Sequence, residues 1–241
     1  MNANKTQCMF IGSRQLLSQL PKNITIKIHD TSIQPTICVK NLGLHMDRYM
    51  VFDKHISEIT RKVTGTLMFI NRIKDYFDRE TRSVIVQSLV LSIMNYCISI
   101  WGTTNATQLK HAQKLQNFAA KIVDGKARKY DHVTPVLKDL QWLYIKDKII
   151  YDTGITMFKY VNRLYPNDFL TFRTIGDVTG SLTRQHNHLY VKKTNTDSGA
   201  RSLLVRGAKL WNNLPSKVKE ANTLNSFKTK LRIEILQGNM L

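Results

Sequence analysis

Apolar and polar residues alternate along this chain with two different periods, and the change falls near residue 50. Ile24, Ile26 and Ile28 alternate with polar residues, which is the pattern of a half-buried strand. Two further short strands are expected at 37–39 and 42–46. The period of two therefore predicts a short β hairpin or meander in the N-terminal part of the chain.

From residue 53 onward, apolar residues recur every three to four positions, which is typical of amphipathic helices. The first helix is expected to begin with Asp53 as its N-cap and to bury Ile56, Ile59, Val63, Leu67, Ile70 and Phe77. The second is expected over 79–100 and should bury Ile85, Leu89, Ile93, Tyr96 and Ile100. Further helices are expected from 107, from 134, over 145–164, over 200–211 and around 224–231.

These elements predict an α+β fold that is mainly α and is arranged in three segments. Residues 1–50 carry the β structure, and residues 51–165 form a helical bundle. Residues 166–241 form a loop-rich connector followed by C-terminal helices. The connector is expected because glycine, serine, threonine and asparagine repeatedly punctuate the first part of that segment.

The chain is strongly basic. Lysine and arginine total 36 of 241 residues against 17 aspartates and glutamates, which gives a formal net charge of +19. A basic surface attracts phosphate, and phosphate contacts supply most of the non-specific affinity for nucleic acid. The alternative is a basic protein whose lysines are simply solvated. The apolar fraction of 42% argues against wholesale disorder.

Three cysteines, Cys8, Cys38 and Cys97, are scattered along the chain without a Cys-x-x-Cys pair. Their odd number and wide spacing favour reduced thiols in an intracellular protein, and the nucleus and the cytoplasm both remain open. The first residues lack the basic and apolar regions of a secretory signal. The longest apolar stretch, 84–101, is interrupted by polar residues, so a buried helix and no membrane partner are expected.

Three short motifs stand in a fixed order along the chain. Asn2-Ala3-Asn4-Lys5-Thr6 opens it, Val39 to Asp47 follows with the sequence VKNLGLHMD, and Leu210 to Pro215 reads LWNNLP. In this order the motifs resemble the C-terminal part of a jockey-like reverse transcriptase from a non-LTR retrotransposon. The resemblance covers nearly the whole chain. It implies the end of a palm, a primer-grip hairpin and a helical thumb from an RNA-directed DNA polymerase.

The resemblance also implies which catalytic parts to look for. The family's catalytic aspartates precede the N-x-x-K-T run, and the sequence given starts with that run. Two-metal polymerases need paired carboxylates, and no two acidic residues are adjacent in this chain. The chain alone is therefore expected to be inactive and to hold no cofactor, whereas the intact family enzyme uses magnesium. Lys5 matches the motif lysine as a possible catalytic remnant; the alternative is an exposed terminal lysine.

Leu42 and Gly43 match the primer grip of the family, a hairpin that holds the 3′ end of the primer. Glycine suits that role because a backbone without Cβ can approach nucleic acid closely. The alternative is a glycine that serves only a turn or a bulge. His186 and His188 form a His-x-His pair, but no cysteine or third histidine has zinc-like spacing, so no metal site is expected.

Two polar strips on the expected helices are candidates for binding phosphate. Projection at 100° per residue defines a first basic strip opposite the apolar stripe: Lys54, Arg61, Gly65 and Arg72. Glu58 interrupts it. A second basic strip on the third helix contains no acid: Lys110, Lys114, Asn117 and Lys121. These strips predict sequence-independent binding of an RNA–DNA or DNA duplex through its backbone; the alternative for each is a solvated face.

Two other functions remain open at this point. One is a non-enzymatic helical module that binds a protein partner and uses its charge only for solubility. The other is a polymerase that is completed by a separate chain carrying the palm aspartates. The motif around Trp211 is interpreted as structural, because Pro215 prevents the helix from continuing.

Overall fold

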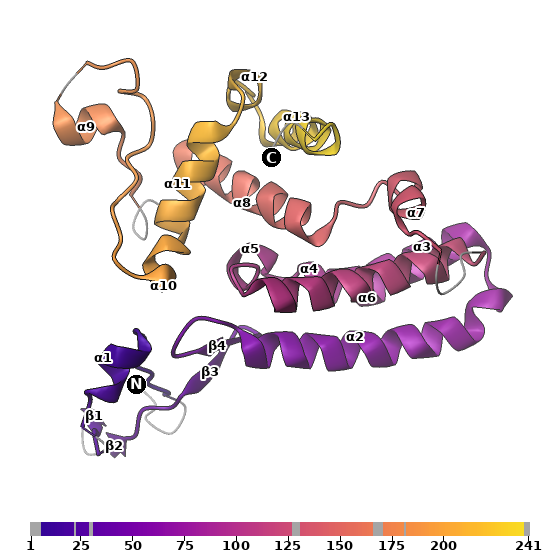
Figure 1. Cartoon of the computed structure of the whole chain (residues 1–241), viewed down its shortest axis with the longest axis horizontal. Helices are drawn as coiled ribbons and strands as arrows, with labels where there is room; N and C mark the ends of the chain where they lie inside the picture. The colour runs from indigo at the N-terminus through magenta and orange to yellow at the C-terminus, as the bar shows by residue number, and fades with distance from the viewer. Residues whose placement is uncertain are drawn as a thin grey trace. The chain divides into compact units, whose positions relative to one another are not determined.

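The computed structural model describes residues 6–21, 23–28, 31–126, 131–165, 171–180 and 182–238 (Figure 1). It has two short antiparallel strand pairs near the N-terminus, followed by helices. The expected α+β fold, mainly α, is thus confirmed. The chain forms two compact units, Met1–Ile145 and Lys146–Leu241, and each is described by itself.

The N-terminal part of the first unit contains one short helix and four strands: α1 (Arg14–Ser18), β1 (Ile26–Ile28), β2 (Thr31–Ile33), β3 (Cys38–Asn41) and β4 (Leu44–Asp47). Strands β1 and β2 pair with each other, and β3 pairs with β4. The register of β3 and β4 places Asn41 opposite Leu44, so only two residues form the loop. Strands were expected at each of these places except 31–33.

The loop of the β3–β4 hairpin consists of Leu42 and Gly43. Their φ angles are +45° and +87°. Positive φ at both central positions belongs to a type I′ turn, whose twist matches that of the flanking strands. Gly43 therefore occupies a turn position and not a bulge, and its conformation alone accounts for a glycine there.

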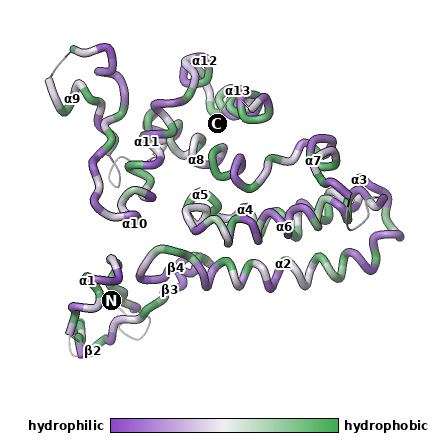
Figure 2. Tube along the Cα trace, viewed as in Figure 1, coloured by the Kyte–Doolittle hydropathy of each residue, from purple (hydrophilic) through white to green (hydrophobic). Residues whose placement is uncertain are grey.

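The rest of the first unit is helical. Its elements are α2 (Asp53–Ile73), η2 (Lys74–Tyr76), α3 (Arg79–Val86), η3 (Gln87–Leu91), α4 (Ser92–Asn95), α5 (Ile98–Trp101), α6 (Ala106–Asp124) and α7 (Thr134–Asp139). Helix α2 packs against β4 and α6, and α3 also packs against α6. Hydrophobic and hydrophilic positions alternate along α2 (Figure 2), and the expected stripe from Ile56 to Ile70 is buried.

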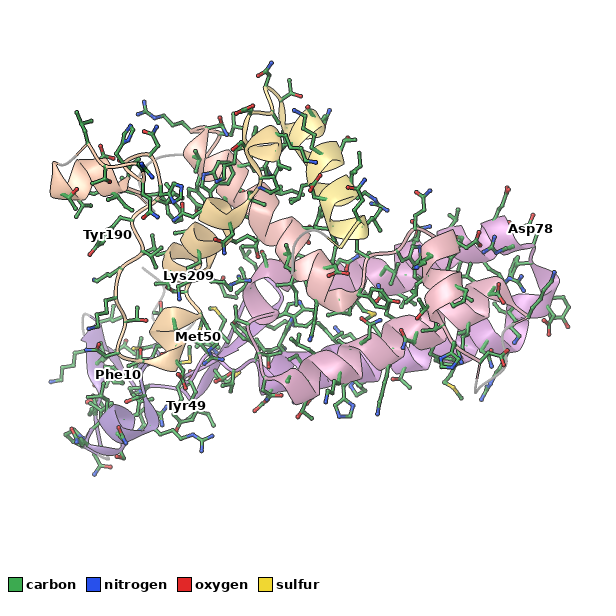
Figure 3. All side chains as sticks on the ribbon, turned by 45° about the horizontal axis from the view of Figure 1, so that its top comes forward. Phe10, Tyr49, Met50, Asp78, Tyr190 and Lys209 are labelled. Carbon is green, nitrogen blue, oxygen red and sulfur yellow. The ribbon has the colours of Figure 1, made fainter. Side chains whose placement is uncertain are left out.

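Helix α2 does not begin as expected. Its N-cap is Phe52, in the left-handed conformation with φ +62°, and Asp53 is already helical. The carboxylate that organises this junction is Asp47, which accepts hydrogen bonds from the backbone N–H groups of Tyr49, Val51 and Phe52 over 2.6–3.2 Å. The tight loop after β4 thus determines where the helix starts. Beyond the end of α2 and η2, Asp78, which is labelled in Figure 3, is the N-cap of α3. Its side chain accepts from the N–H of Thr81 at 2.7 Å.

The expected second helix is interrupted, and its buried face was predicted wrongly. The segment η3 is a turn of π-helix, and Cys97 adopts a left-handed conformation that separates α4 from α5. The buried side chains are Val86, Val90, Leu91, Met94 and Ile98, whereas Leu89, Tyr96 and Ile100 are exposed. The segment is apolar around most of its circumference, so its period does not select one face. The π turn then shifts the register further.

The second unit contains α8 (Ile145–Val161), α9 (Ile175–Thr179), α10 (Asp197–Ala200), α11 (Leu203–Asn213), α12 (Ser216–Lys219) and α13 (Leu224–Leu236), with the first residue of α8 ending the first unit. Its core is aromatic: the ring of Phe227 lies 4.5 Å from that of Phe158 and 6.0 Å from that of Trp211, measured between centroids. Trp211 is buried, and α11 ends before Pro215 as expected. The side chain of Asn212 accepts from the N–H of Leu189 and donates to its carbonyl oxygen, both at 2.9 Å. These two hydrogen bonds tie the connector to α11.

The two units divide the chain differently from the three segments expected from the sequence. Helix α8 was expected to belong to the helical bundle that precedes residue 166. In the structure, all but its first residue group with the C-terminal unit, where Phe158 packs on Phe227. The three segments stay a prediction about domains.

Candidate nucleic-acid interface

The first basic strip lies on the solvent side of α2. Lys54, Arg61, Gly65 and Arg72 are all exposed, opposite the buried stripe. No heavy atom lies within 4 Å of a Cβ built on Gly65, so the backbone there is open to a ligand. Arg61 forms an exposed ion pair with Glu58 at 3.1 Å, and this pair lowers the pKa of the Glu58 carboxyl. The acid that interrupts the strip therefore offsets the charge of Arg61.

The second basic strip lies on α6, which is capped at both ends. The side chain of Asn105 accepts from the N–H of Gln108 at the N-terminus, and Gly125 adopts φ +74° at the C-terminus. On this helix Lys110 and Lys114 are exposed, whereas Asn117 and Lys121 are half-buried. The half-buried pair indicates that part of this strip faces a concave surface.

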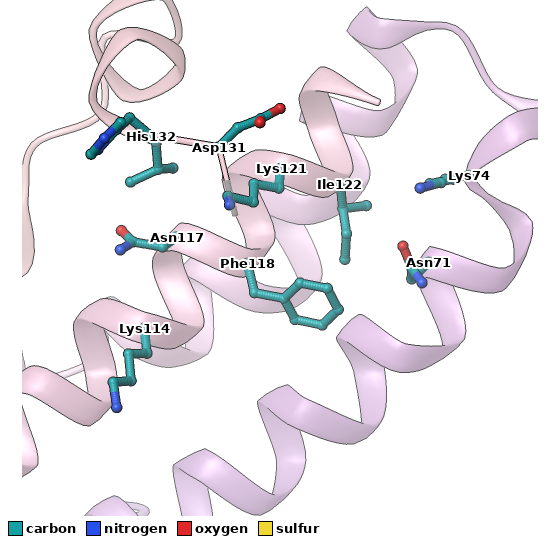
Figure 4. Close-up of a pocket in the computed structure, with 10 residues that line it drawn as sticks. Asn71, Lys74, Lys114, Asn117, Phe118, Lys121, Ile122, Asp131 and His132 are labelled. Carbon is teal, nitrogen blue, oxygen red and sulfur yellow. The ribbon is translucent and has the colours of Figure 1, made fainter. Parts of the chain in front are cut away.

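That concave surface is a groove of about 920 Å³ in the first unit. The end of α2, the start of η2, the C-terminal half of α6 and the residues before α7 line it: Asn71, Lys74, Lys114, Asn117, Phe118, Lys121, Ile122, Asp131, His132 and Val133 (Figure 4). We call it the basic groove. Among the described residues, its lining carries three lysines and one carboxylate, that of Asp131.

The basic groove brings together only part of the predicted site. Lys114, Asn117 and Lys121 of the second basic strip line it, whereas no residue of the first basic strip does. The α2 side is supplied instead by Asn71 and by Lys74 of η2, neither of which was predicted. No local pattern predicts either residue, because their place on the groove depends on how the end of α2 packs against α6. Phe118 was also missed, since its grouping with the lysines depends on how α6 packs.

A hydrogen-bond network fixes the groove side of α6. Asn117 Oδ1 accepts from Gln113 Nε2 at 2.8 Å, and Gln113 Oε1 accepts from the N–H of Ile145 at 2.9 Å. Buried Gln116 donates to the carbonyl of Leu143 at 2.8 Å. Together these bonds tie α6 to the segment 143–145. The amide of Asn117 is therefore held in one orientation, with its oxygen engaged.

Leu42 and Gly43, the predicted primer-grip residues, border a second, smaller cavity of about 380 Å³. We call it the hairpin pocket. It lies between the β3–β4 hairpin, α2 and α4, and its lining includes Leu42, Gly43, Lys40, His45, His55, Lys62 and Tyr96. The side chain of Leu42 is 86% exposed. The hairpin tip thus presents an apolar side chain to solvent, with two lysines on the same pocket.

His55 is the buried polar residue of the hairpin pocket. It is 4% exposed, and its Nδ1 accepts from the N–H of His45 at 3.5 Å. Its Nε2 has no hydrogen-bond partner among the described residues. Burial, with the nearby charges of His45 and Lys62, lowers the pKa of His55 to about 4. His55 is therefore neutral at physiological pH.

The remaining candidates from the sequence are Lys5 and the His186–His188 pair. Lys5 lies outside the described residues. His186 Nδ1 lies 2.8 Å from the carbonyl oxygen of Thr183. Across the part of the chain that the structure describes, no three His, Cys, Asp or Glu side chains gather as metal ligands would. In the same residues, each helix is too short or too polar to cross a membrane.

Comparisons of this chain with models of protein families, with curated proteins and with solved structures found no match. The function must therefore be argued from the geometry of the basic groove and of the hairpin.

Proposed function

We propose that this chain binds nucleic acid through the basic groove and the adjoining face of α6. The observation that supports the proposal most directly is the placement of Lys74, Lys114 and Lys121 on one groove between α2, η2 and α6. Because the helices that carry these lysines are packed, their backbones need no ordering before several phosphates are met at once. Phosphate contacts of this kind position nucleic acid but read no sequence. Binding is therefore sequence-independent and dominated by charge.

The polymerase resemblance gives this binding a context. In that context the β3–β4 hairpin corresponds to the primer grip and the helical bundle to the thumb of a non-LTR retrotransposon reverse transcriptase. The ligand would then be an RNA–DNA or DNA duplex, recognised by its backbone. No adjacent acidic pair exists in this chain, so we propose binding without polymerisation by the chain alone. The three free cysteines suit an intracellular setting.

The test is a charge reversal with a matched control. Lys74, Lys114 and Lys121 are changed together to glutamate, and the control changes the exposed lysines Lys192, Lys193 and Lys209 in the same way. Both variants change the net charge by the same amount, so the long-range electrostatic attraction to nucleic acid falls equally in the two. We expect the groove variant to lose most of its affinity for a DNA duplex and the control to lose little. Circular dichroism must first show that both variants keep their helices.

Equal losses of affinity in the two variants would show that the protein is merely basic and that the groove has no special role. Tight binding of a protein partner that does not change with salt would instead favour the interaction-module alternative. A polymerase completed by a second chain would be favoured if a palm fragment carrying paired aspartates restored primer extension with magnesium.

A further inference from the structure

The basic groove contains an aromatic side chain that binding to a duplex backbone does not require. Phe118 follows Asn117 on α6 and lines the groove beside Lys114 and Lys121. Its ring is directed from α6 towards α2, with Asn71 on the facing side (Figure 4). An aromatic ring, two amides and three lysines therefore share one concave surface.

This combination matches the parts of an unpaired nucleotide. Every base has a π face that can stack on an aromatic ring, and stacking platforms inside basic grooves are typical of proteins that bind single strands. The amides of Asn71 and Asn117 offer donors and acceptors to a base edge. Gln113 already donates to Asn117 Oδ1 at 2.8 Å, so Asn117 would serve a nucleotide as a donor through its amino group.

A duplex cannot use Phe118 in this way. Its bases are paired and stacked, so their faces are covered, and only the sugar–phosphate backbone meets a protein groove. The volume of about 920 Å³ lies in the range of sites that enclose small molecules. It can accommodate nucleotides of one strand but not the cross-section of a double helix. A duplex can reach the groove lysines with the phosphates of one strand while its bases stay outside, so Phe118 distinguishes single from double strands, whereas Lys74, Lys114 and Lys121 serve both.

We propose that the basic groove holds an unpaired nucleotide of a single-stranded segment, with its base stacked on Phe118 and its phosphates on Lys114 and Lys121. The proposal rests on the proposed function, because it assumes that the lysines bind phosphate. It adds a substrate class: single-stranded nucleic acid, such as an overhang beside a duplex.

The first test measures the affinity of the full chain for a fluorescent oligo(dT), for the same backbone without bases, and for a blunt duplex. The variant Phe118→Leu keeps an apolar side chain but removes the π face. We expect it to bind oligo(dT) roughly tenfold more weakly, the loss typical of one base–aromatic stack, and to bind duplex and the abasic strand like the parent. The control Phe69→Leu changes a ring on α2 that is 62% exposed and lies outside the groove.

A second variant keeps the test decisive if Phe118→Leu disturbs folding. Phe118→Trp retains an aromatic face, and its added fluorescence, relative to the parent, should be quenched by oligo(dT) and not by duplex. The inference is overturned if quenching is absent, or if Phe118→Leu weakens single-strand and duplex binding equally.

The proposed function and this inference fail under different results. If reversing Lys74, Lys114 and Lys121 leaves all binding intact, the proposed function fails; if it abolishes binding while Phe118→Leu changes nothing, only this inference fails.

Discussion

The hydroxyl of Tyr96 donates a 2.5 Å hydrogen bond to the backbone carbonyl of Leu42, 54 residues earlier in the chain. The ring also lies 3.7 Å from the position a Cβ would take on Gly43. One side chain at the end of α4 therefore holds the tip of the β3–β4 hairpin. This hydrogen bond couples the hairpin, which we predicted from the resemblance to be a primer grip, to the helical bundle that carries the basic groove.

Changing Tyr96 to phenylalanine should loosen the hairpin tip without unfolding the unit. The variant loses one partly exposed hydrogen bond, so we expect a loss of about 1 kcal/mol or less in unfolding free energy. Amide hydrogen exchange at residues 41–44 should accelerate. Tyr76→Phe is the control, because Tyr76 is 85% exposed and lies outside the hairpin pocket. Unchanged exchange in Tyr96→Phe would show that the two strands hold the tip by themselves.

The part of the fold that the sequence predicted best is helix α2. Its apolar residues occupy one face, and a single buried face is the only arrangement that satisfies such a stripe. Two short strands were also expected around β3 and β4, but Leu42 and Gly43 were placed inside the second strand, and only the resemblance implied a hairpin there. The segment from Arg79 to Ile100 was mispredicted because apolar residues surround it, and only packing against α2 and α6 selects the buried side.

The residues of the candidate site likewise divide into those that a local pattern predicts and those that only packing brings in. Lys114, Asn117 and Lys121 were found because their helical spacing is a local property. Lys74 and Phe118 join them only through the packing of α2 against α6, which no local pattern contains. Asp47 was not recognised as the residue that organises the start of α2, because its acceptor role depends on the path of the loop that follows it.

Replacing Gly65 with alanine should have opposite effects on stability and on binding. Glycine inside a helix costs roughly 1 kcal/mol relative to alanine, and a Cβ there meets no atom within 4 Å. The variant should therefore melt at a higher temperature. If nucleic acid approaches the backbone of the first basic strip at this point, the added methyl group should weaken duplex binding. Thermal denaturation and a duplex titration measure the two effects, and unchanged affinity would remove Gly65 from the interface.

Replacing Gly125 with alanine should destabilise the first unit. Gly125 ends α6 with φ +74°, and a Cβ would lie 2.5–2.9 Å from the guanidinium of Arg82. We expect a backbone cost on the order of 1 kcal/mol and a further cost from displacing Arg82. The double variant with Arg82→Ala separates the two costs, because without the guanidinium only the backbone cost remains. Equal destabilisation by Gly125→Ala in the two backgrounds would show that the Arg82 side chain moves aside freely.

Stability should fall in mild acid because of His55. Its pKa is lowered from 6.5 in the unfolded chain to about 4 in the folded one, so the unfolded state binds more protons between these values. Above pH 6.5 His55 is neutral in both states and costs no stability. As the pH falls from 6.5 to about 4, protonation of His55 in the unfolded chain lowers the free energy of unfolding by up to about 3 kcal/mol. Urea unfolding across this range measures it. His55→Phe should flatten the dependence, whereas His111→Gln, which changes an exposed histidine, should leave it unchanged.

Salt should weaken duplex binding in proportion to the phosphates that the lysines neutralise. Each neutralised phosphate contributes a slope of about −0.9 to the logarithm of the binding constant against the logarithm of salt concentration on B-DNA. If Lys74, Lys114 and Lys121 each meet a phosphate, reversing them should make the slope shallower by about 0.9 for every phosphate that is no longer neutralised. The matched variant at Lys192, Lys193 and Lys209 should keep the slope of the parent, because these lysines do not line the groove and are not proposed to neutralise a phosphate of the bound duplex. Fluorescence anisotropy across a salt series gives the slopes of the parent, the groove variant and the matched variant.

A parent slope near zero would contradict charge-dominated binding. A steep slope that is unchanged in the groove variant would place the phosphate-binding lysines elsewhere in this chain.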